Sequence, residues 1–467
     1  MPNQPTPHST PTTTTTHLQR VLGMPSLVLF GLAYMVPLTV FTTYGIVTDL
    51  TEGHLPGAYV VTLTAMLFTA YSYGRMVRAH PYAGSAYTYT QKSFGPHLGF
   101  MTGWALMLDY VFLPMINYLV IGIYLHAAFD MIPIWVWILA AIVLVTGLNV
   151  LGIRMVSRMN LILIAIQIVF IAVFLVGALR AVAGEPLPSL TAPFFSDGAD
   201  TSKILGGAAI LCLSFLGFDA VSTLSEETHD PRRRVPRAIM LTTLAGGVMF
   251  IVISYVGHLA FPNWQSFTDV DSAALDVMKH IGGAAMAAFF TAAYISGCFA
   301  SAMASQASVS RILYAMGRDG VLPRRFFAYL HPRFRNPVLA TLAVGAVSLV
   351  ALFISLDLAS AMISFGALVA FSFVNLSVIK HYVVDEGRRT AADLVKFGVV
   401  PAIGVLLSLW LWTSLSGLTF IVGLSWVAAG FIYLLGLTRM FTRRPPELRL
   451  TEVELDDEAD PKSAVRS

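Results

Sequence analysis

Uninterrupted apolar stretches recur along the whole sequence, each about as long as the twenty residues that an α-helix needs to cross a bilayer. Apolar residues make up 56% of the 467 residues and charged residues only 12%, a balance outside the range of soluble domains. Because the stretches are continuous rather than alternating, they argue against a transmembrane β-barrel. We therefore predict an all-α polytopic membrane protein with twelve transmembrane helices, near residues 21–49, 56–79, 97–127, 133–152, 156–182, 202–224, 236–260, 276–314, 336–356, 358–382, 395–415 and 417–441.

The segments outside these spans are polar. Residues 1–19 are rich in Thr, Pro and Ser without an apolar core, which predicts a disordered tail and no cleavable signal peptide. Residues 442–467 form an acidic tail. The segment Tyr82–Pro96 is too polar to span, and we expect it to lie at the membrane interface as a short amphipathic piece.

The positive charges predict the orientation of the chain. With a cytoplasmic amino terminus, all of the 29 lysines and arginines fall on cytoplasmic segments except Arg180, Lys203 and Lys279. A missed or extra span in the middle would invert everything downstream and destroy this asymmetry. We therefore expect both termini in the cytoplasm.

Two acids remain at membrane depth after loops and tails are assigned, Asp109 in the third predicted span and Asp219 in the sixth. No lysine or arginine remains there to neutralise them. Carboxylates in a medium of low dielectric constant must be protonated or met by a mobile cation, which is what a carrier of cations or protons needs. An Asp–Asp pair that shares one proton is the alternative, and it would itself titrate.

The sixth predicted span contains the stretch Ser214–Ala220, in which Gly217 and Asp219 lie near the middle of the span. A glycine costs about 1 kcal/mol in a helix interior, and an aspartate at membrane depth costs roughly 2.5–3.5 kcal/mol. The combination predicts a helix interrupted at mid-bilayer, with Asp219 facing a cavity. A kinked helix whose aspartate pairs with a neighbour is the alternative.

The first predicted span is interrupted by Pro37, which removes a backbone donor and clashes with the preceding turn. A proline kink without a binding role is common in membrane helices, but this span and the sixth lie five spans apart. Matching breaks in two five-helix halves indicate a 5+5 inverted repeat, with the substrate site at the midplane between broken helices 1 and 6. We place the repeats at residues 20–182 and 200–382, with helices 11 and 12 at 395–441.

The third predicted span places Asp109, Leu113, Ile116 and Asn117 on one helical face. Asp109 is about a dozen residues from the cytoplasmic end, or roughly 18 Å, which is near mid-bilayer. This face is therefore expected to border the site.

Further residues near the breaks are candidates for the cavity wall. Aromatic faces attract a cation by up to about 2 kcal/mol when dry, although lipid-facing or core packing is the alternative for each of Tyr34, Tyr110, Phe215 and Phe218. Ser301 and Ser305, four residues apart in the eighth span, could line the cavity or be small packing residues.

The sequence contains no phosphate-binding loop, zinc-protease motif or hydrolase nucleophile motif. We therefore expect no enzyme activity, no cofactor, no metal site and no nucleic-acid partner. Cys212 and Cys298 lie within apolar stretches, so no disulfide framework is expected.

The chain resembles the amino acid–polyamine–organocation carriers over essentially all twelve spans, and among them the bacterial putrescine importers. The stretches that carry the resemblance are 31–34 with Pro37 and 39–41, 84–89, 108–110 with 112–117, 214–220 with 225–228, 307–311 and 365–371. The resemblance implies a LeuT-like fold and import through the inner membrane of a bacterium, driven by the proton motive force. It also implies that Asp219 and the Asp109–Tyr110 turn lie beside the substrate.

One departure from the family pattern narrows the expected substrate. Amino-acid carriers of this superfamily usually have Gly-Ser-Gly in the first break, where backbone amides bind the substrate carboxylate, whereas this chain has Pro37, Leu38 and Thr39. Backbone amides are thus less available for a substrate carboxylate, whereas two acids are available for ammonium groups. Both features favour a diamine, held by Asp219 at one end and Asp109 at the other. An amino acid permease of the same fold is the alternative.

The predicted site follows from these observations. We expect the substrate to be bound by Tyr34, Pro37, Thr39, Asp109, Tyr110, Phe215, Gly217, Phe218, Asp219 and Ser305. We expect Asp219 or Glu226 to accept the coupling proton, with sodium coupling left open, in a monomer or a weak homodimer.

Overall fold

The chain is all-helical in the computed structural model, which describes residues 22–81, 85–151, 153–183, 189–196, 199–318, 320–331, 337–443 and 445. Within these ranges, 11 helices are long and apolar enough to cross a membrane, which confirms a polytopic all-α protein. The ninth predicted span corresponds to a shorter apolar helix, Val338–Leu352. The predicted tails, 1–19 and almost all of 442–467, lie outside the described residues.

The first part of the chain forms, in order, α1 (Met24–Tyr34), η1 (Pro37–Phe41), α2 (Tyr44–Leu50), α3 (Leu55–Ala79), α4 (Ser85–Phe94), α5 (Pro96–Ala128), α6 (Ile134–Leu151) and α7 (Ile153–Ala183). Prolines stand in the first turn of α1, α3 and α5, where a missing N–H removes no helical hydrogen bond. The element η1 is a short 3₁₀ helix that continues the first span after its break.

The middle of the chain forms α8 (Thr201–Leu211), the 3₁₀ helices η2 (Cys212–Phe215) and η3 (Asp219–Glu227), α9 (Pro231–Ala260), η4 (Trp264–Ser266) and α10 (Ala274–Arg318). Asp200 caps α8 by accepting a hydrogen bond from the backbone N–H of Ser202 at 2.8 Å. α10 is kinked at Gly282 and Gly283, whose backbone angles are not helical.

The last part forms α11 (Arg324–Phe327), α12 (Val338–Val347), η5 (Ser348–Leu352), α13 (Leu356–Val378), the π-helices η6 (Ile379–Asp385) and η7 (Leu394–Val399) around α14 (Ala391–Asp393), α15 (Val400–Thr413) and α16 (Gly417–Leu437). Ser355 and Ser416 cap α13 and α16. These serines mark the starts of two spans, as N-cap preferences predict.

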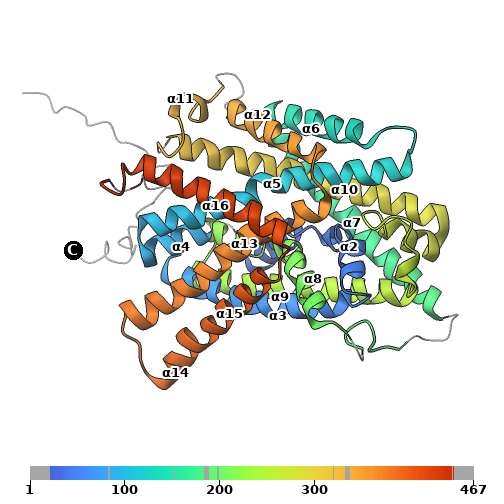
Figure 1. The fold of residues 1–467 in the computed structure, drawn as a ribbon, viewed down its shortest axis with the longest axis horizontal. Helices are drawn as coiled ribbons and strands as arrows, with labels where there is room; N and C mark the ends of the chain where they lie inside the picture. The colour runs from blue at the N-terminus through green and yellow to red at the C-terminus, as the bar shows by residue number, and fades with distance from the viewer. Residues whose placement is uncertain are drawn as a thin grey trace, which may run out of the picture.

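Two groups of helices surround the broken spans. The first group is α3 and α9, which pack along each other. The second group is α5, α6, α10 and α12, which pack against one another. Figure 1 shows the first group in the lower part of the molecule and α6, α10 and α12 in the upper part. The broken first and sixth spans contact the first group, through α1 against α9 and η3 against α9.

A buried glutamine joins all four helices of the second group. Gln306 of α10 donates to Thr146 Oγ1 of α6 at 2.9 Å and to the carbonyl of Thr341 of α12 at 3.2 Å. Its Oε1 accepts from the Tyr118 hydroxyl of α5 and from Asn149 Nδ2 of α6, both at 3.2 Å. We call these five residues the Gln306 cluster. Because both ends of the amide are satisfied, the cluster fixes α5, α6, α10 and α12 relative to one another.

The predicted amphipathic piece at 82–96 forms α4, which packs against α5 and α13. Residues 82–84 lie outside the described residues. Ser85, Tyr89 and Thr90 are buried, so this helix contributes side chains to the protein interior.

Candidate substrate site

The first span breaks directly before Pro37. α1 ends at Tyr34, and Val36 has a φ of 52° and a ψ of 101°, a backbone conformation that β-branched residues rarely adopt. Pro37 then begins η1, where its lack of an N–H leaves no helical bond unmade. The predicted break is confirmed, and its strained residue is Val36.

The second break lies between η2 and η3. Leu216 is extended, and Gly217 has a φ of 121°, a region that only glycine adopts without strain. A Cβ on Gly217 would lie 2.6 Å from Cδ1 of Tyr34 and 3.0 Å from the backbone nitrogen of Met35. The two breaks therefore touch each other, and the predicted interruption of the sixth span is confirmed.

A small cavity of about 30 Å³ lies between the breaks. Five residues of the first span, four of α5, two of the sixth span and one of α10 line it: Tyr34, Met35, Val36, Thr39, Thr42, Leu113, Ile116, Asn117, Val120, Leu213, Leu216 and Ser301. The volume holds about two water molecules. Asn117 Nδ2 donates to Ser301 Oγ at 3.1 Å and so joins α5 to α10 at the cavity wall.

Two buried carboxylates lie near Tyr34 without a basic partner, although neither is among the residues that line the cavity. Asp109 and Asp219 are 4% and 5% exposed, and no buried lysine or arginine occurs in the part of the chain that the structure describes. Their charges interact with each other and with Tyr34, which lines the cavity. The two sequence candidates at membrane depth are thus brought together at one site.

The two carboxylates have different surroundings. Asp219 begins η3, and its Oδ1 accepts a hydrogen bond from the backbone N–H of Gly217 at 3.2 Å, at the amino end of the half-helix. Oδ1 of Asp109 has no hydrogen-bond partner. Asp109 is therefore the carboxylate with an unused acceptor.

Buried hydroxyl groups gather near Asp219. The Ser85 and Tyr73 hydroxyls are buried near Asp219, and the Ser85 hydroxyl interacts with both the Asp219 carboxylate and the Tyr73 hydroxyl. The Tyr89 hydroxyl also lies near Asp219 and interacts with the buried hydroxyl of Ser222. Buried polar groups are rare and costly in a membrane protein, so their concentration around a carboxylate indicates a site for ions, water or protons.

Aromatic side chains gather beyond the cavity, towards the carboxyl end of α5. Tyr124 lies one turn beyond Val120, and its ring contacts that of Tyr294 at 4.9 Å between centroids. The Tyr294 and Thr42 hydroxyls are hydrogen-bonded at 2.6 Å. We call the fully buried aromatic residues at this end the Phe41 cluster: Phe41, Tyr124, Phe170, Phe174, Phe290 and Tyr294.

A second aromatic group lies on the side of Asp219. Tyr73 of α3 contacts Tyr89, Phe218 and Phe371 with ring centroids 6.0, 5.7 and 6.0 Å apart. All four rings of this Tyr73 cluster are fully buried.

The structure places several of the sequence candidates at the cavity or beside the carboxylates. Tyr34 and Thr39 line the cavity, and Pro37 begins η1 next to it. Tyr110 lies near both Asp109 and Asp219.

Other candidates point elsewhere. Phe215 packs against Phe250 of α9, with ring centroids 5.6 Å apart, and Phe218 belongs to the Tyr73 cluster. Ser305 donates to the carbonyl of Ser301 at 2.6 Å, and Ser301 is the serine of α10 that lines the cavity. The side chain of Glu226 lies outside the described part of the structure.

Some lining residues were not among the sequence candidates, such as Thr42, Leu213 and Leu216. Thr42 directly follows η1, Leu213 lies on η2 and Leu216 is the extended residue after η2, where helical periodicity gives no signal. No group of side chains that could hold a metal ion occurs within the described ranges.

The sequence is similar to those of known transporters. Residues 26–441 match the family model described as amino acid permease. The chain is 44% identical over 445 residues to the low-affinity putrescine importer PlaP of Escherichia coli strain K12, covering 94% of this chain and 98% of that protein. It is also 28% identical to a methylthioribose transporter and 27% identical to the branched-chain amino acid permease BcaP of Bacillus subtilis, covering 88% and 89% of this chain and 92% of each relative.

Proposed function

We propose that this chain, which belongs to the amino acid permease family and is a membrane transporter rather than an enzyme, imports putrescine by proton-coupled alternating access. The observation that carries the proposal is the pair of buried carboxylates, Asp109 and Asp219, close to Tyr34, which lines the cavity between the two broken helices. The similarity to a putrescine importer over almost the whole chain supports the same substrate.

A divalent organic cation matches the charge of this site. Two ionised carboxylates without a basic neighbour are strongly destabilised in a dry interior, and two ammonium groups would compensate both. The apolar cavity wall of Leu113, Ile116 and Val120 suits a methylene chain. An amino acid would bring its own carboxylate next to Asp109 and Asp219, which costs additional repulsion.

We assign the two carboxylates different roles. The unpartnered Oδ1 of Asp109 takes one ammonium group as a charge-assisted hydrogen bond. Asp219 holds the second charge, which is the other ammonium group or the coupling proton in turn. Its contact with the Gly217 amide links its charge state to the geometry of the break. The hydroxyls of Ser85 and Tyr73 give protons a polar environment on this side.

Transport requires the two closures to open alternately. The cavity of about 30 Å³ must widen to admit a diamine, and in our proposal the Phe41 cluster and the Tyr73 cluster are the two closures that open in turn. In our proposal the Gln306 cluster keeps α5, α6, α10 and α12 together while the broken spans move against them with α3 and α9.

The membrane arrangement completes the proposal. We count Val338–Leu352 as the ninth of twelve spans, although it is shorter than the others. Residues 20–182 and 200–382 then form two five-helix repeats of opposite orientation, with both termini in the cytoplasm of a bacterial cell.

Uptake of radiolabelled putrescine into proteoliposomes, with pH and sodium gradients imposed separately, tests the function. We expect saturable uptake that follows the pH gradient and is competed by unlabelled diamines more strongly than by branched-chain amino acids. Uptake that only amino acids compete would refute the proposal and favour the permease alternative.

Charge-neutralising variants test the site. Asp109→Asn should weaken putrescine binding by about 30-fold or more, because removing one member of a buried charge pair costs about 2–5 kcal/mol. Asp219→Asn should abolish accumulation driven by the pH gradient. Asp130→Asn, at an exposed aspartate after α5, is the matched control. Normal affinity in the Asp109→Asn protein would contradict the assigned role.

A further inference from the structure

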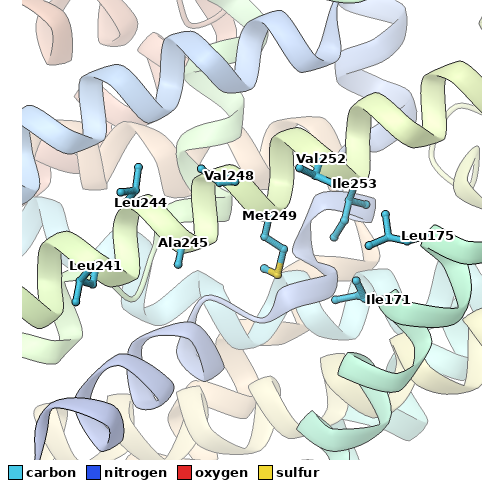
Figure 2. Close-up of a pocket in the computed structure, with 9 residues that line it drawn as sticks. All are labelled: Ile171, Leu175, Leu241, Leu244, Ala245, Val248, Met249, Val252 and Ile253. Atoms are coloured by element: carbon cyan, nitrogen blue, oxygen red, sulfur yellow. The ribbon is translucent and has the colours of Figure 1, made fainter. Parts of the chain in front are cut away.

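An apolar groove of about 490 Å³ runs between α7 and α9, away from the substrate cavity. Figure 2 shows Ile171 and Leu175 of α7 on one side and the α9 side chains from Leu241 to Ile253 along the other. Every lining residue is apolar. The groove is therefore a feature of the surface that these two spans share.

The groove faces outward from the protein. Leu241, Leu244, Val248 and Val252 are 40–47% exposed, although they lie in the middle of a helix that can cross a membrane. In the bilayer these side chains contact hydrocarbon. From Leu241 to Ile253 the groove extends about 18 Å along α9, close to the roughly 15 Å depth of one leaflet.

A positive charge stands at one end of the same helical face. Arg237 precedes Leu241 by four residues and Arg234 precedes it by seven, so both lie on the stripe that lines the groove. Both side chains are exposed, as are those of Arg232 and Arg233. In the described part of α9 and the residue before it, Asp230 is the only acid, and it pairs with Arg233 at 3.8 Å.

We propose that this groove binds a phospholipid with an anionic headgroup. One acyl chain lies along α9 from Leu241 to Val252, and the phosphate group contacts Arg234 and Arg237. The order of the features along α9, a cationic head region followed by an apolar channel one leaflet long, matches the chemistry of such a lipid.

A second copy of the chain fits this surface less well. A two-fold axis along the membrane normal brings the same patch of each copy together. The arginine-bearing ends of the two α9 helices would then face each other at the same depth, and like charges would repel. The charge distribution therefore favours a lipid over a dimer at this face.

The lipid site adjoins the transport machinery through α9. Gly246, next to the groove residue Ala245, packs so closely on Met35 that a Cβ there would lie 2.6 Å from Met35 Cε. Met35 also lines the substrate cavity. In this proposal α9 therefore contacts the lipid with one face and Met35 of the first break with another.

Native mass spectrometry of the full chain in detergent, titrated with palmitoyl-oleoyl phosphatidylglycerol or phosphatidylcholine, tests the proposal. We expect the first phosphatidylglycerol to bind at least tenfold more tightly than phosphatidylcholine. Each arginine near a charged headgroup contributes roughly a fivefold preference, so R234Q/R237Q should lower the affinity for phosphatidylglycerol by about 20- to 30-fold and leave phosphatidylcholine unchanged. Arg389→Gln, at an exposed arginine beyond α13, is the charge control.

A groove-filling variant tests the position of the acyl chain. Ala245→Trp should abolish the tight phosphatidylglycerol site, whereas Ile421→Trp, at a 66% exposed position of α16, should not. If Ala245→Trp does not fold, the exposed arginine pair decides alone. Equal affinity for both lipids, unchanged affinity in R234Q/R237Q, or a lipid-free dimer that Ala245→Trp dissociates would overturn the proposal. Because the readout is binding, this result is independent of whether putrescine is the substrate.

Discussion

Replacement of Gln306 by leucine should loosen the helix group against which the broken spans move. Leucine keeps most of the side-chain volume but removes the two donated and two accepted hydrogen bonds of the Gln306 cluster, which measure 2.9–3.2 Å. Side-chain hydrogen bonds between membrane helices contribute about 0.6 kcal/mol each on average. Four such bonds give an expected destabilisation of about 2.5 kcal/mol.

The contribution of a single contact can be separated by a double-mutant cycle. The Tyr118 hydroxyl donates only to Gln306 among its described contacts. Tyr118→Phe alone should therefore cost about 0.6 kcal/mol, and should cost nothing, or even stabilise, when leucine already occupies position 306. A purely steric role for Gln306 would leave the two changes additive.

Unfolding of the purified protein in mixed micelles with increasing SDS, followed by circular dichroism, measures these differences. Uptake by the same samples reports whether the loosened helix group still supports transport. A Gln306→Leu protein within about 0.5 kcal/mol of the wild type, or an additive cycle, would refute the assignment of the cluster as a structural joint between the four helices.

Three further results are expected. Gly217→Ala places a side chain at a φ of 121° and against the first break, so strain of about 1–3 kcal/mol should abolish uptake at normal membrane levels; normal uptake would contradict this. Tyr294→Phe removes the 2.6 Å hydrogen bond to Thr42 and should let the Phe41 cluster open about threefold more often. An impermeant thiol reagent should then label a Thr39→Cys protein faster, and unchanged labelling would argue against this closure. Burial and nearby positive charges lower the pKa of His80 from 6.5 to about 4. Between these two pH values the unfolded chain therefore binds a proton that the folded chain does not bind. Stability should therefore fall as the pH drops from 6.5 towards 4, and His80→Gln should reduce this loss in a series of thermal unfolding measurements. An equal dependence of stability on pH in the wild type and the variant would contradict this role of His80.

The positions of both breaks could be predicted because they depend on local chemistry. Pro37 cannot continue a helix, and Gly217 next to Asp219 has no place in an ordinary span. The strain at Val36 could not be predicted, since a positive φ at a β-branched residue is imposed by the surrounding packing and contradicts the residue's own preference. The inverted repeat remains an inference from these two breaks.

The cavity wall was only partly predictable, for a reason of periodicity. Leu113, Ile116 and Asn117 follow from Asp109 by the 3.6-residue period of a regular helix, and all three line the cavity. Leu213 lies on a 3₁₀ helix, where the period changes, so its direction follows from the structure alone.

The packing of α4 was also beyond sequence reasoning. Its low hydrophobicity suggested a position at the membrane interface, yet Ser85 and Tyr89 are buried beside Asp219. Polar side chains can enter a protein interior when tertiary contacts surround them, and a composition window does not register such contacts.

The contact between Gly217 and Tyr34 restricts the order in which these two positions can change during evolution. A Cβ at 217 would stand 2.6 Å from the Tyr34 ring, so any larger residue there is excluded while the tyrosine is present. A smaller residue at position 34 could appear first, at the expense of the cavity wall. The two positions should therefore vary together among descendants of a common ancestor, with loss of the aromatic ring preceding loss of the glycine.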